Sequence, residues 1–209
     1  MRRPLSGALW AFDRTHQNAL DEGCLAGVDE AGVGPLAGPV VAAAVIFRGR
    51  AIRGLNDSKQ LKAEIREKLF WNIIRGALVG IGVAAEDEID RLNIYQASRL
   101  AMRKAVLALP HTPARVLVDG RIKIDLPLDQ RAIVKGDTKS ASIAAASIVA
   151  KVYRDAWMRH LDQLYPHYYF YKHKGYSTAL HLKSLRRLGP CPVHRRSFAP
   201  VAALCGAAR

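Results

Sequence analysis

The strongest constraint on the fold is the stretch GVDEAGVGPLAGPVVAAAVI, which covers residues 27–46. A short apolar lead-in ends on the acidic pair Asp29 and Glu30, and a segment rich in Gly and Pro follows. The apolar run 39–47 then predicts a buried strand. Two apolar runs joined by such a segment indicate a pair of adjacent strands. The sheet is therefore expected to begin here, with two carboxylates at the end of its first strand.

The rest of the chain alternates strand-like and helix-like patterns and ends in helices. A helix is expected over 56–74, with Asp57 or Ser58 as its N-cap and Leu61, Ile65 and Leu69 on its buried face. The order of elements predicts an α/β domain with helices packed on a mixed sheet. The other expected elements are strands over 24–29, 77–85, 114–120 and 131–137, and helices over 87–109, 140–165 and 178–188.

Composition and charge narrow the class of function. A chain of 209 residues, half of them hydrophobic, is long enough for one domain that buries roughly 70% of its unfolded surface. The formal net charge is +14, and it is concentrated in the C-terminal third. Such an excess of positive charge favours a polyanionic partner over a purely solubilising surface, and nucleic acid is the leading candidate. An anionic membrane is disfavoured because no basic amphipathic helix is evident.

The cysteines and the N-terminus indicate the compartment. Cys24, Cys191 and Cys205 are odd in number, far apart and without CxxC spacing, which predicts neither a disulfide framework nor a zinc site. The start MRRPLSGALWAF has too short an apolar part for a signal peptide, and no apolar run approaches the roughly 18 residues that span a bilayer. The expectation is a reduced, cytoplasmic monomer.

Three aspartates follow strand-like patterns: Asp29 after LAGV, Asp119 after VLV and Asp137 after IVKG. Ligand sites collect at strand ends in open sheets, so these side chains are expected to converge. Two carboxylates about 4 Å apart repel by about 4 kcal/mol at an effective dielectric near 20, so such a cluster requires protons or cations. Oxygen-only ligation favours Mg²⁺ or Mn²⁺ over zinc. A basic protein with such a cleft is predicted to be a metal-dependent nuclease.

The acidic pair poses a local problem. Successive side chains of a regular strand point to opposite faces, so Asp29 and Glu30 are expected to serve one site only if the backbone bends there. Gly32, Gly34 and Pro35 are expected to supply that bend, and glycines also let a sugar-phosphate approach the main chain. The alternative is a tight strand connection with two solvated acids.

Taken together, the motifs resemble the ribonuclease HII family over about residues 25–199. They are, in order, GVDEAGVGPLAGPVVAAAV, LNDSKQL, VLVDG, KGDTKSASIAAASIVAKVYRD, HKGYSTALHLKSLRRLGP and HRRSFAPV. The resemblance implies a ribonuclease-H-like mixed central sheet flanked by helices, with a helical C-terminal extension. The expected division is an N-terminal preamble over 1–22, a catalytic domain over 23–164, and the extension with its tail over 165–209, packed on the same domain.

The resemblance also implies an activity. It is endonucleolytic hydrolysis of the RNA strand of RNA–DNA hybrids, and incision 5′ to ribonucleotides embedded in duplex DNA, as in ribonucleotide excision repair. The products carry 3′-hydroxyl and 5′-phosphate ends. The expected partners are therefore RNA–DNA hybrid and ribonucleotide-containing duplex DNA.

The same resemblance assigns the acids. Asp29, Glu30 and Asp119 are the implied ligands of Mg²⁺ or Mn²⁺. The fourth acid is either Asp137 or Asp155, between which spacing does not decide. We favour Asp137 because its pattern places it at a strand end, whereas Asp155 lies inside a helix, four residues after a lysine with which it can pair.

The family reads the ribose 2′-hydroxyl with a Gly-Arg-Gly loop and a tyrosine, here residues 32–34 and Tyr176. This chain departs from the family at Val33, where an apolar side chain replaces a guanidinium with up to five donors. Reduced incision at single ribonucleotides is therefore expected. The implied nucleic-acid contacts are Gly32, Val33, Gly34, Lys59, Ser140, Tyr176 and Arg195 or Arg196.

Two alternatives come from other classes. A phosphodiesterase of the same fold that acts on DNA junctions would share the acids but would not need the Gly-rich sugar reader. A non-catalytic basic binding protein would bind duplex with steep salt dependence and without metal-dependent turnover.

Overall fold

The computed structural model describes residues 5–20, 22–49 and 51–205. A five-stranded sheet of order β3-β2-β1-β4-β5 forms its centre. The antiparallel part contains β1 (Leu25–Ala31), β2 (Val40–Phe47) and β3 (Ala77–Ala84). On its other edge β1 pairs in parallel with β4 (Arg115–Asp119), which pairs in parallel with β5 (Asp129–Ile133). The predicted mixed sheet is confirmed.

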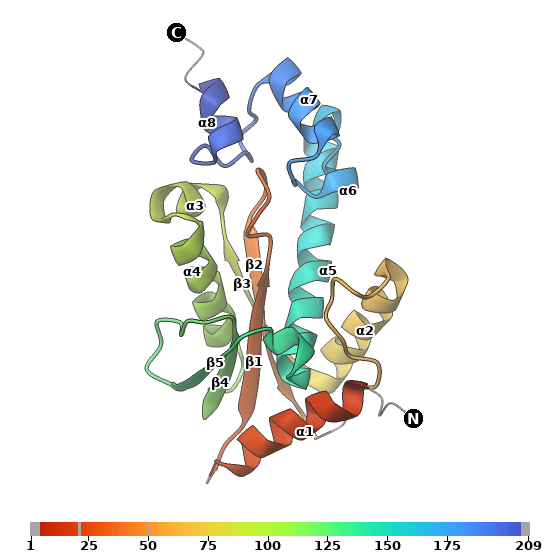
Figure 1. Cartoon of the computed structure of the whole chain (residues 1–209), viewed down its shortest axis with the longest axis vertical. Helices are drawn as coiled ribbons and strands as arrows, with labels where there is room; N and C mark the ends of the chain where they lie inside the picture. The colour runs from red at the N-terminus through yellow and green to blue at the C-terminus, as the bar shows by residue number, and fades with distance from the viewer. Residues whose placement is uncertain (1–4, 21, 50, 206–209) are drawn as a thin grey trace.

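Helices cover both faces of the sheet (Figure 1). One face carries α3 (Glu86–Leu92) and α4 (Ile94–Leu107), and the other carries α5 (Ala141–Leu164) with α2 (Ala63–Gly76) beside it. Glycines in the strands allow this close packing: a Cβ on Gly82 would lie 2.1 Å from the Ala101 carbonyl oxygen of α4. A Cβ on Gly27 of β1 would likewise lie 2.3 Å from the backbone of α5. Small residues thus set the distance between sheet and helices.

The C-terminal extension lies at one end of this sandwich, beyond the tips of β1 and β2 (Figure 1). It contains a 3-10 turn, η2 (Pro166–Tyr168), and the helices α6 (Phe170–His173), α7 (Ala179–Leu188) and α8 (Ala199–Cys205). Thr178 caps α7, as predicted, by accepting a hydrogen bond from the His181 N–H. Tyr168 and Phe170 are buried and stacked on each other, so these two rings pack the extension against the core.

Two predicted helices differ from those observed. The helix expected over 87–109 is broken into α3 and α4 at Asn93, which has φ 71° and whose side chain caps α4. The helix expected from Asp57 or Ser58 begins only at Ala63, because 57–60 forms a turn closed by the Asp57 carbonyl. Ile65 is 46% exposed rather than buried, and the buried face of α2 is Leu69 and Ile73.

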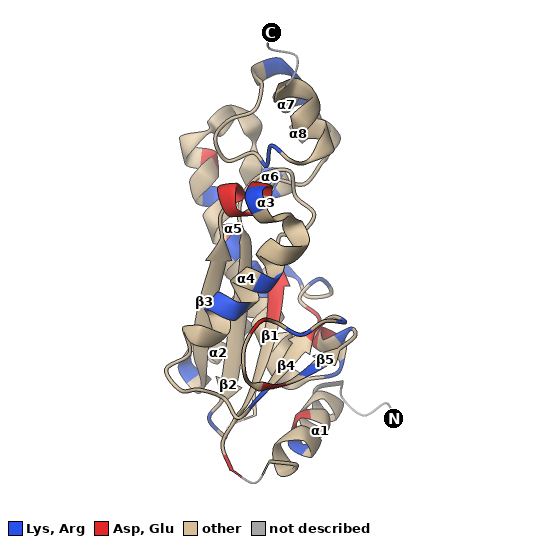
Figure 2. Cartoon of the chain, turned by 90° about the vertical axis from the view of Figure 1, so that its left-hand side faces the viewer, with Lys and Arg blue, Asp and Glu red and all other residues tan. Residues whose placement is uncertain are grey.

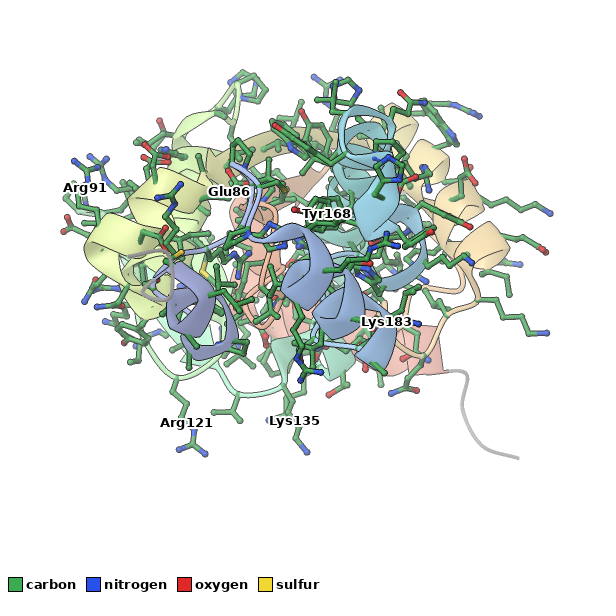
Figure 3. All side chains as sticks on the ribbon, turned by 90° about the horizontal axis from the view of Figure 1, so that it is seen from above. Glu86, Arg91, Arg121, Lys135, Tyr168 and Lys183 are labelled. Atoms are coloured by element: carbon green, nitrogen blue, oxygen red, sulfur yellow. The ribbon has the colours of Figure 1, made fainter. Side chains whose placement is uncertain are left out.

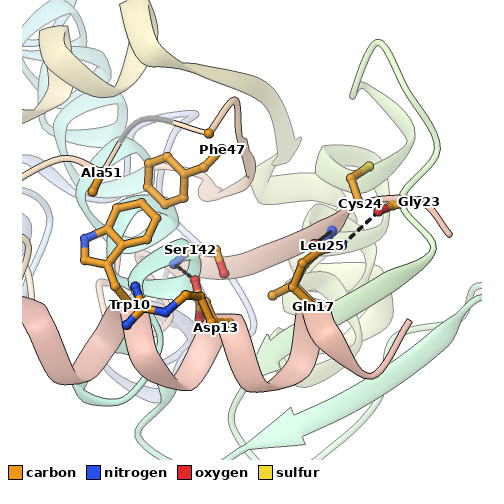
Figure 4. Close-up of a pocket in the computed structure, with 11 residues that line it drawn as sticks. Trp10, Asp13, Gln17, Gly23, Cys24, Leu25, Phe47, Ala51 and Ser142 are labelled. Atoms are coloured by element: carbon orange, nitrogen blue, oxygen red, sulfur yellow. Dashed lines mark hydrogen bonds between the residues drawn. The ribbon is translucent and has the colours of Figure 1, made fainter. Parts of the chain in front are cut away.

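The N-terminal residues also contain a helix that the sequence patterns do not indicate, α1 (Leu5–Asn18). The buried Asp13 anchors it, since its Oδ2 accepts a hydrogen bond from the Ser142 N–H in the first turn of α5. Figure 4 shows the adjoining cavity of about 460 Å³, lined by Trp10, Asp13, Phe47 and Ser142 among others. In the part of the chain that the structure describes, no helix is long and apolar enough to cross a bilayer.

Candidate active site

Asp29 and Glu30 lie near the end of β1, in register with β2. Because the strand is regular there, their side chains lie on opposite faces: Asp29 is beside Ser147 of α5, and Glu30 is beside Ser98 of α4. The expectation of a bend at the acidic pair is therefore wrong, since β1 continues to Ala31. The Gly-rich segment changes the chain direction only after the acids.

The neighbouring strand, not a bend, brings the acids together. Pairing between β1 and β4 ends with Val28 opposite Val118. One step further, Asp29 and Asp119 lie side by side on adjacent parallel strands, and β4 ends there. Figure 2 shows the acidic end of β1 close to β4 and β5. Both acids of β1 consequently flank an edge that β4 no longer covers.

Asp137 reaches the same edge by a different route from the one predicted. Strand β5 ends at Ile133, and Asp137 lies in the 3-10 turn η1 (Gly136–Thr138) rather than at the strand end. The Gly136 N–H donates to Asp119 Oδ1 at 2.6 Å, which ties this turn to the end of β4. A Cβ on Gly136 would lie 3.1 Å from the same oxygen, so glycine suits this close approach.

The carboxylates perturb one another. Burial raises the pKa of Asp29 well above its usual range, and the charges of Glu30 and Asp119 raise it further. Burial, followed by the charge of Asp119, raises the pKa of Glu30 to about 7. The same two causes raise the pKa of Asp137. Burial disfavours the ammonium of Lys59, but Asp29 and Asp137 outweigh this and raise its pKa. Negative charge is thus concentrated at one edge of the sheet, with one lysine facing it.

This donor set fits a hard divalent cation. Glu30 Oε2 is buried and has no hydrogen-bond partner. Asp29 Oδ1 accepts a local bond, from the Glu30 N–H at 2.7 Å. Within residues 5–205, leaving out positions 21 and 50, no three His, Cys, Asp or Glu side chains are already grouped tightly enough to hold an ion. The carboxylates are near enough to raise one another's pKa, one buried oxygen has no partner, and oxygen-only ligation suits Mg²⁺ or Mn²⁺.

Asp155 lies away from this cluster. Its Oδ1 accepts from Lys151 Nζ at 2.7 Å, the pairing expected one helical turn apart. Its Oδ2 lies 3.8 Å from Arg66 Nη1 of α2. Both oxygens are therefore engaged with cations between α5 and α2.

The glycine loop over residues 32–34, called the junction loop below, directly follows β1. Gly32 has φ 98°, and a Cβ there would lie 2.0 Å from Arg154 Nε, so only glycine fits. Gly34 faces Tyr176, whose Cε1 would lie 3.8 Å from a Cβ on Gly34. Val33 and Tyr176 are 39% and 44% exposed. Loop and tyrosine thus meet at the surface, although they are far apart in sequence.

Two buried arginines hold the junction loop and the segment that follows it, and sequence reasoning missed their role. Arg195 is fully buried, and its guanidinium donates to the carbonyls of Gly32, Val33 and Gly38 at 2.6–3.0 Å. Arg154 is almost fully buried and donates to three further carbonyls, those of Ala37, Pro39 and Lys174. In a sequence, both resemble surface cations of a basic protein.

Burial lowers the pKa of Arg195 to about 9 and also lowers that of Arg154. Neither guanidinium has a carboxylate within 4 Å among the described residues, although the charge of Glu86 acts on both. Figure 3 looks down on this end of the molecule, where Glu86 and Tyr168 lie towards the centre and Arg91 projects from the rim. The bound carbonyls are therefore the main partners of the two cations.

The other residues predicted to contact nucleic acid differ in their exposure to solvent. Lys59 and Arg196 are exposed. Ser140 is fully buried, caps α5 by accepting from the Ile143 N–H, and is bonded to Ser142. Ser140 and Arg195 are therefore not available at the surface, because their polar atoms already have partners inside the protein.

A mixed sheet of this order, flanked by helices and with carboxylates where its central parallel strands end, defines a ribonuclease-H-like nuclease. The ribonuclease HII family model matches residues 26–201. The chain is 58% identical over 191 residues to the ribonuclease HII of Acidovorax sp. JS42, covering 89% of this chain and 91% of that protein. It is 55% identical over 179 residues to that of Geobacillus kaustophilus, covering 85% and 68%. The chain belongs to the ribonuclease HII family, and it is thus an endoribonuclease that acts on RNA–DNA hybrids.

Solved structures agree on the fold. The ribonuclease H2 of Pyrococcus horikoshii OT3 aligns with TM-score 0.74 and 27% identity, covering 87% of this chain and 96% of that one. The Archaeoglobus fulgidus ribonuclease HII solved with PCNA aligns with TM-score 0.71 and 26% identity, covering 84% and 95%. Bst-RNase HIII in complex with Mn²⁺ aligns with TM-score 0.68 and 21% identity, covering 92% and 72%.

Proposed function

We propose that this endoribonuclease incises 5′ to ribonucleotides embedded in duplex DNA, in addition to cleaving hybrids, and leaves 3′-hydroxyl and 5′-phosphate ends. The observation that carries this is the proximity of Asp29, Glu30 and Asp119 at an open sheet edge, directly before a glycine loop that meets Tyr176. Carboxylates next to a loop that can read a sugar suit an enzyme of ribonucleotide excision repair. Free cysteines at positions 24, 191 and 205 support a reduced, cytoplasmic setting.

We assign Asp29, Glu30 and Asp119 as the ligands of Mg²⁺ or Mn²⁺. Divalent ions bound there supply electrostatic stabilisation of the phosphodiester transition state and promote deprotonation of the attacking water. The protein keeps the carboxylates close: the Gly136 N–H fixes Asp119 Oδ1, and strand pairing fixes the acids of β1. Asp137, with its raised pKa beside Asp119, is suited to hold a proton on its carboxylate during turnover.

Nucleic-acid contacts follow from access and charge. The ammonium of Lys59 faces the carboxylates and is assigned to a phosphate near the scissile bond. The main chain of the junction loop and the Tyr176 ring are assigned to the sugar at the junction, where close approach is needed to sense a 2′-hydroxyl. The exposed Arg196 is assigned to a phosphate further along the duplex.

The decisive experiment is incision of a duplex carrying one ribonucleotide, with its all-DNA twin as control, in Mg²⁺, in Mn²⁺ and in chelator. Cleavage only of the ribonucleotide duplex, only with metal, and its loss in Asp119→Asn are expected. Cleavage of both duplexes would favour a DNA-junction enzyme. Binding without turnover under every condition would favour a binding protein.

Matched variants identify the fourth acid. Asp137→Asn is expected to lower the rate by at least 100-fold, whereas Asp155→Asn, which alters a carboxylate paired with Lys151, is expected to stay within threefold of the parent. The reverse order of effects would transfer the role to Asp155.

A further inference from the structure

The segment 191–195, called the strap below, joins the two parts of the proposed junction reader. Its main chain pairs with the segment that follows the junction loop: the Arg195 N–H donates to the Leu36 carbonyl at 2.8 Å, and the Gly38 N–H donates to the Val193 carbonyl at 2.9 Å. Ala37 and His194 form an antiparallel bridge between these bonds. The strap therefore fixes residues 36–38, which follow the junction loop, through three consecutive residues of its own.

The side chain of Arg195 holds the junction loop. Its three guanidinium nitrogens donate to the carbonyls of Gly32, Val33 and Gly38. A fully buried guanidinium with carbonyl partners alone is costly to desolvate, and lysine could not reproduce its fork of donors. The bonds to Gly32 and Val33 orient the peptide units of the junction loop itself.

The preceding residue, His194, holds Tyr176 through a chain of hydrogen bonds. His181 Nδ1 lies 2.9 Å from the Tyr176 carbonyl, and a carbonyl only accepts, so Nδ1 carries the proton. His181 Nε2 is then an acceptor for His194 Nε2–H at 3.0 Å. This leaves His194 Nδ1 to accept from the Cys191 N–H at 3.1 Å. Each ring is neutral with one defined tautomer, and the chain ends on the backbone of Tyr176.

We propose that His194 and Arg195 are paired positioning residues, which set the spacing between the junction loop and Tyr176 and so determine discrimination for a ribonucleotide junction. This rests on the proposed function, in which the loop and Tyr176 read the sugar. The two side chains leave the same strap in different directions: one reaches the loop and the other reaches the tyrosine. Neither side chain touches the carboxylate cluster, so substituting them is expected to affect cleavage of a continuous hybrid less than incision at a single ribonucleotide.

The test is the ratio of two rates: incision of a one-ribonucleotide duplex over cleavage of a continuous RNA–DNA hybrid. Arg195→Lys is expected to lower this ratio at least tenfold while hybrid cleavage stays within threefold. The control is Arg115→Lys, which alters a buried arginine that also bonds a main-chain carbonyl but lies at the opposite end of β4, and it is expected to leave the ratio unchanged. An unchanged ratio in Arg195→Lys, or an equal fall of both rates, would overturn the proposal.

A double substitution separates positioning from general damage. In a Tyr176→Ala background, Arg195→Lys is expected to change the ratio by less than twofold, because the spacing no longer has a tyrosine to position. Independent, multiplying losses would contradict the proposal. If the unaltered enzyme fails to incise the one-ribonucleotide duplex, the proposed function itself fails, which is a different outcome from an unaffected ratio.

Amide exchange in the unaltered protein covers the case in which Arg195→Lys does not fold. The N–H groups of Gly38 and Arg195 join the strap to the segment that follows the junction loop, so they are expected to exchange at similar rates as one unit. Both are expected to slow at least threefold when the one-ribonucleotide duplex is added in chelator, and less with the all-DNA duplex. Unrelated rates, or equal slowing by both duplexes, would overturn the proposal.

Discussion

At the scale of single residues, Val33 is the clearest departure from the family pattern. Its side chain is 39% exposed on the junction loop, and its carbonyl accepts a hydrogen bond from Arg195. Val33→Arg adds a guanidinium to the loop that we propose reads the junction, and one charged hydrogen bond contributes about 1.5 to 3 kcal/mol. We expect at least tenfold tighter binding of a one-ribonucleotide duplex and faster incision, both measured beside Val33→Met as a control for bulk. Equal results for the two variants would show that residue 33 does not face the junction.

Glu30 offers a test of the repulsion at the site. Its folded pKa of about 7 lies above the unfolded value near 4.3, so folding binds a proton and stability falls as pH rises from about 4.5 to 7. Above pH 7 the full cost is present, on the order of 1 to 3 kcal/mol. Glu30→Gln is therefore expected to raise the free energy of unfolding by about that much at pH 8 in chelator.

Urea unfolding measures this effect, with the exposed Asp87→Asn as a control that is expected to have no effect. A less stable Glu30→Gln protein would mean that Glu30 is a structural acid rather than one held for a cation.

Residue patterns predicted the proximity of the acids better than the roles of the buried arginines. An aspartate after a β-branched run marks a strand end, so the proximity of Asp29 and Asp119 follows from neighbouring parallel strands. Arg154 and Arg195 give no such signal, because a buried arginine and a surface arginine look alike in a basic chain. Their roles depend on carbonyls brought to them by distant segments, which only the tertiary fold supplies.

At the scale of elements, the two glycines of the junction loop differ in their surroundings. Gly32 has no room for a side chain, whereas Gly34 faces Tyr176 with room for a methyl group. Gly32→Ala would place a Cβ 2.0 Å from Arg154 Nε at a φ of 98°, so it is expected to cost on the order of 2 to 4 kcal/mol and to displace the loop. Gly34→Ala meets only Tyr176 Cε1 at 3.8 Å and is expected to keep wild-type stability. Thermal unfolding of both variants checks this, and equal losses would show that the Arg154 contact does not constrain Gly32.

Elements were predictable where periodicity was strong and failed where a single residue overrode it. The first four strands and the Ala-rich helix α5 follow their patterns, whereas the strand expected over 131–137 is Asp129–Ile133. The predicted helix over 87–109 is continuous in apolar spacing, but Asn93 adopts a positive φ and caps a new helix instead. Helix α1 was not predicted. It docks through Leu9, which packs in the core, and through the buried Asp13, whose hydrogen bond to the distant Ser142 only the tertiary fold supplies.

At the scale of the whole molecule, the extension and the sheet form one unit through buried polar groups. Arg154 of α5 and Arg195 of the strap both bind carbonyls of the segment between β1 and β2, and the histidine chain links the strap to α7. The many basic residues therefore occupy two environments: some are exposed, as a polyanionic partner requires, whereas Arg154 and Arg195 are buried and bind main-chain carbonyls.

The buried histidines predict an acid transition of the whole molecule. Burial lowers the pKa of His181 and of His194 to about 4, below the value near 6.5 in an unfolded chain. Between those values the unfolded state binds protons that the folded state does not, so their stabilisation is complete above pH 6.5 and is lost as pH falls towards 4. Each contributes up to about 3 kcal/mol, and shared bonds make the sum an upper limit.

Urea unfolding between pH 7 and pH 4.5 is therefore expected to show falling stability, most clearly in a Glu30→Gln background, where the opposite slope of that carboxyl is absent. His194→Gln is expected to flatten the curve while lowering stability at pH 7, because a neutral amide replaces part of the hydrogen-bond chain without titrating. The exposed His160→Gln serves as control and is expected to keep the parental slope. A parental slope in His194→Gln would mean that acid opens the molecule elsewhere, and the strap would then be held by its arginine and main-chain bonds alone.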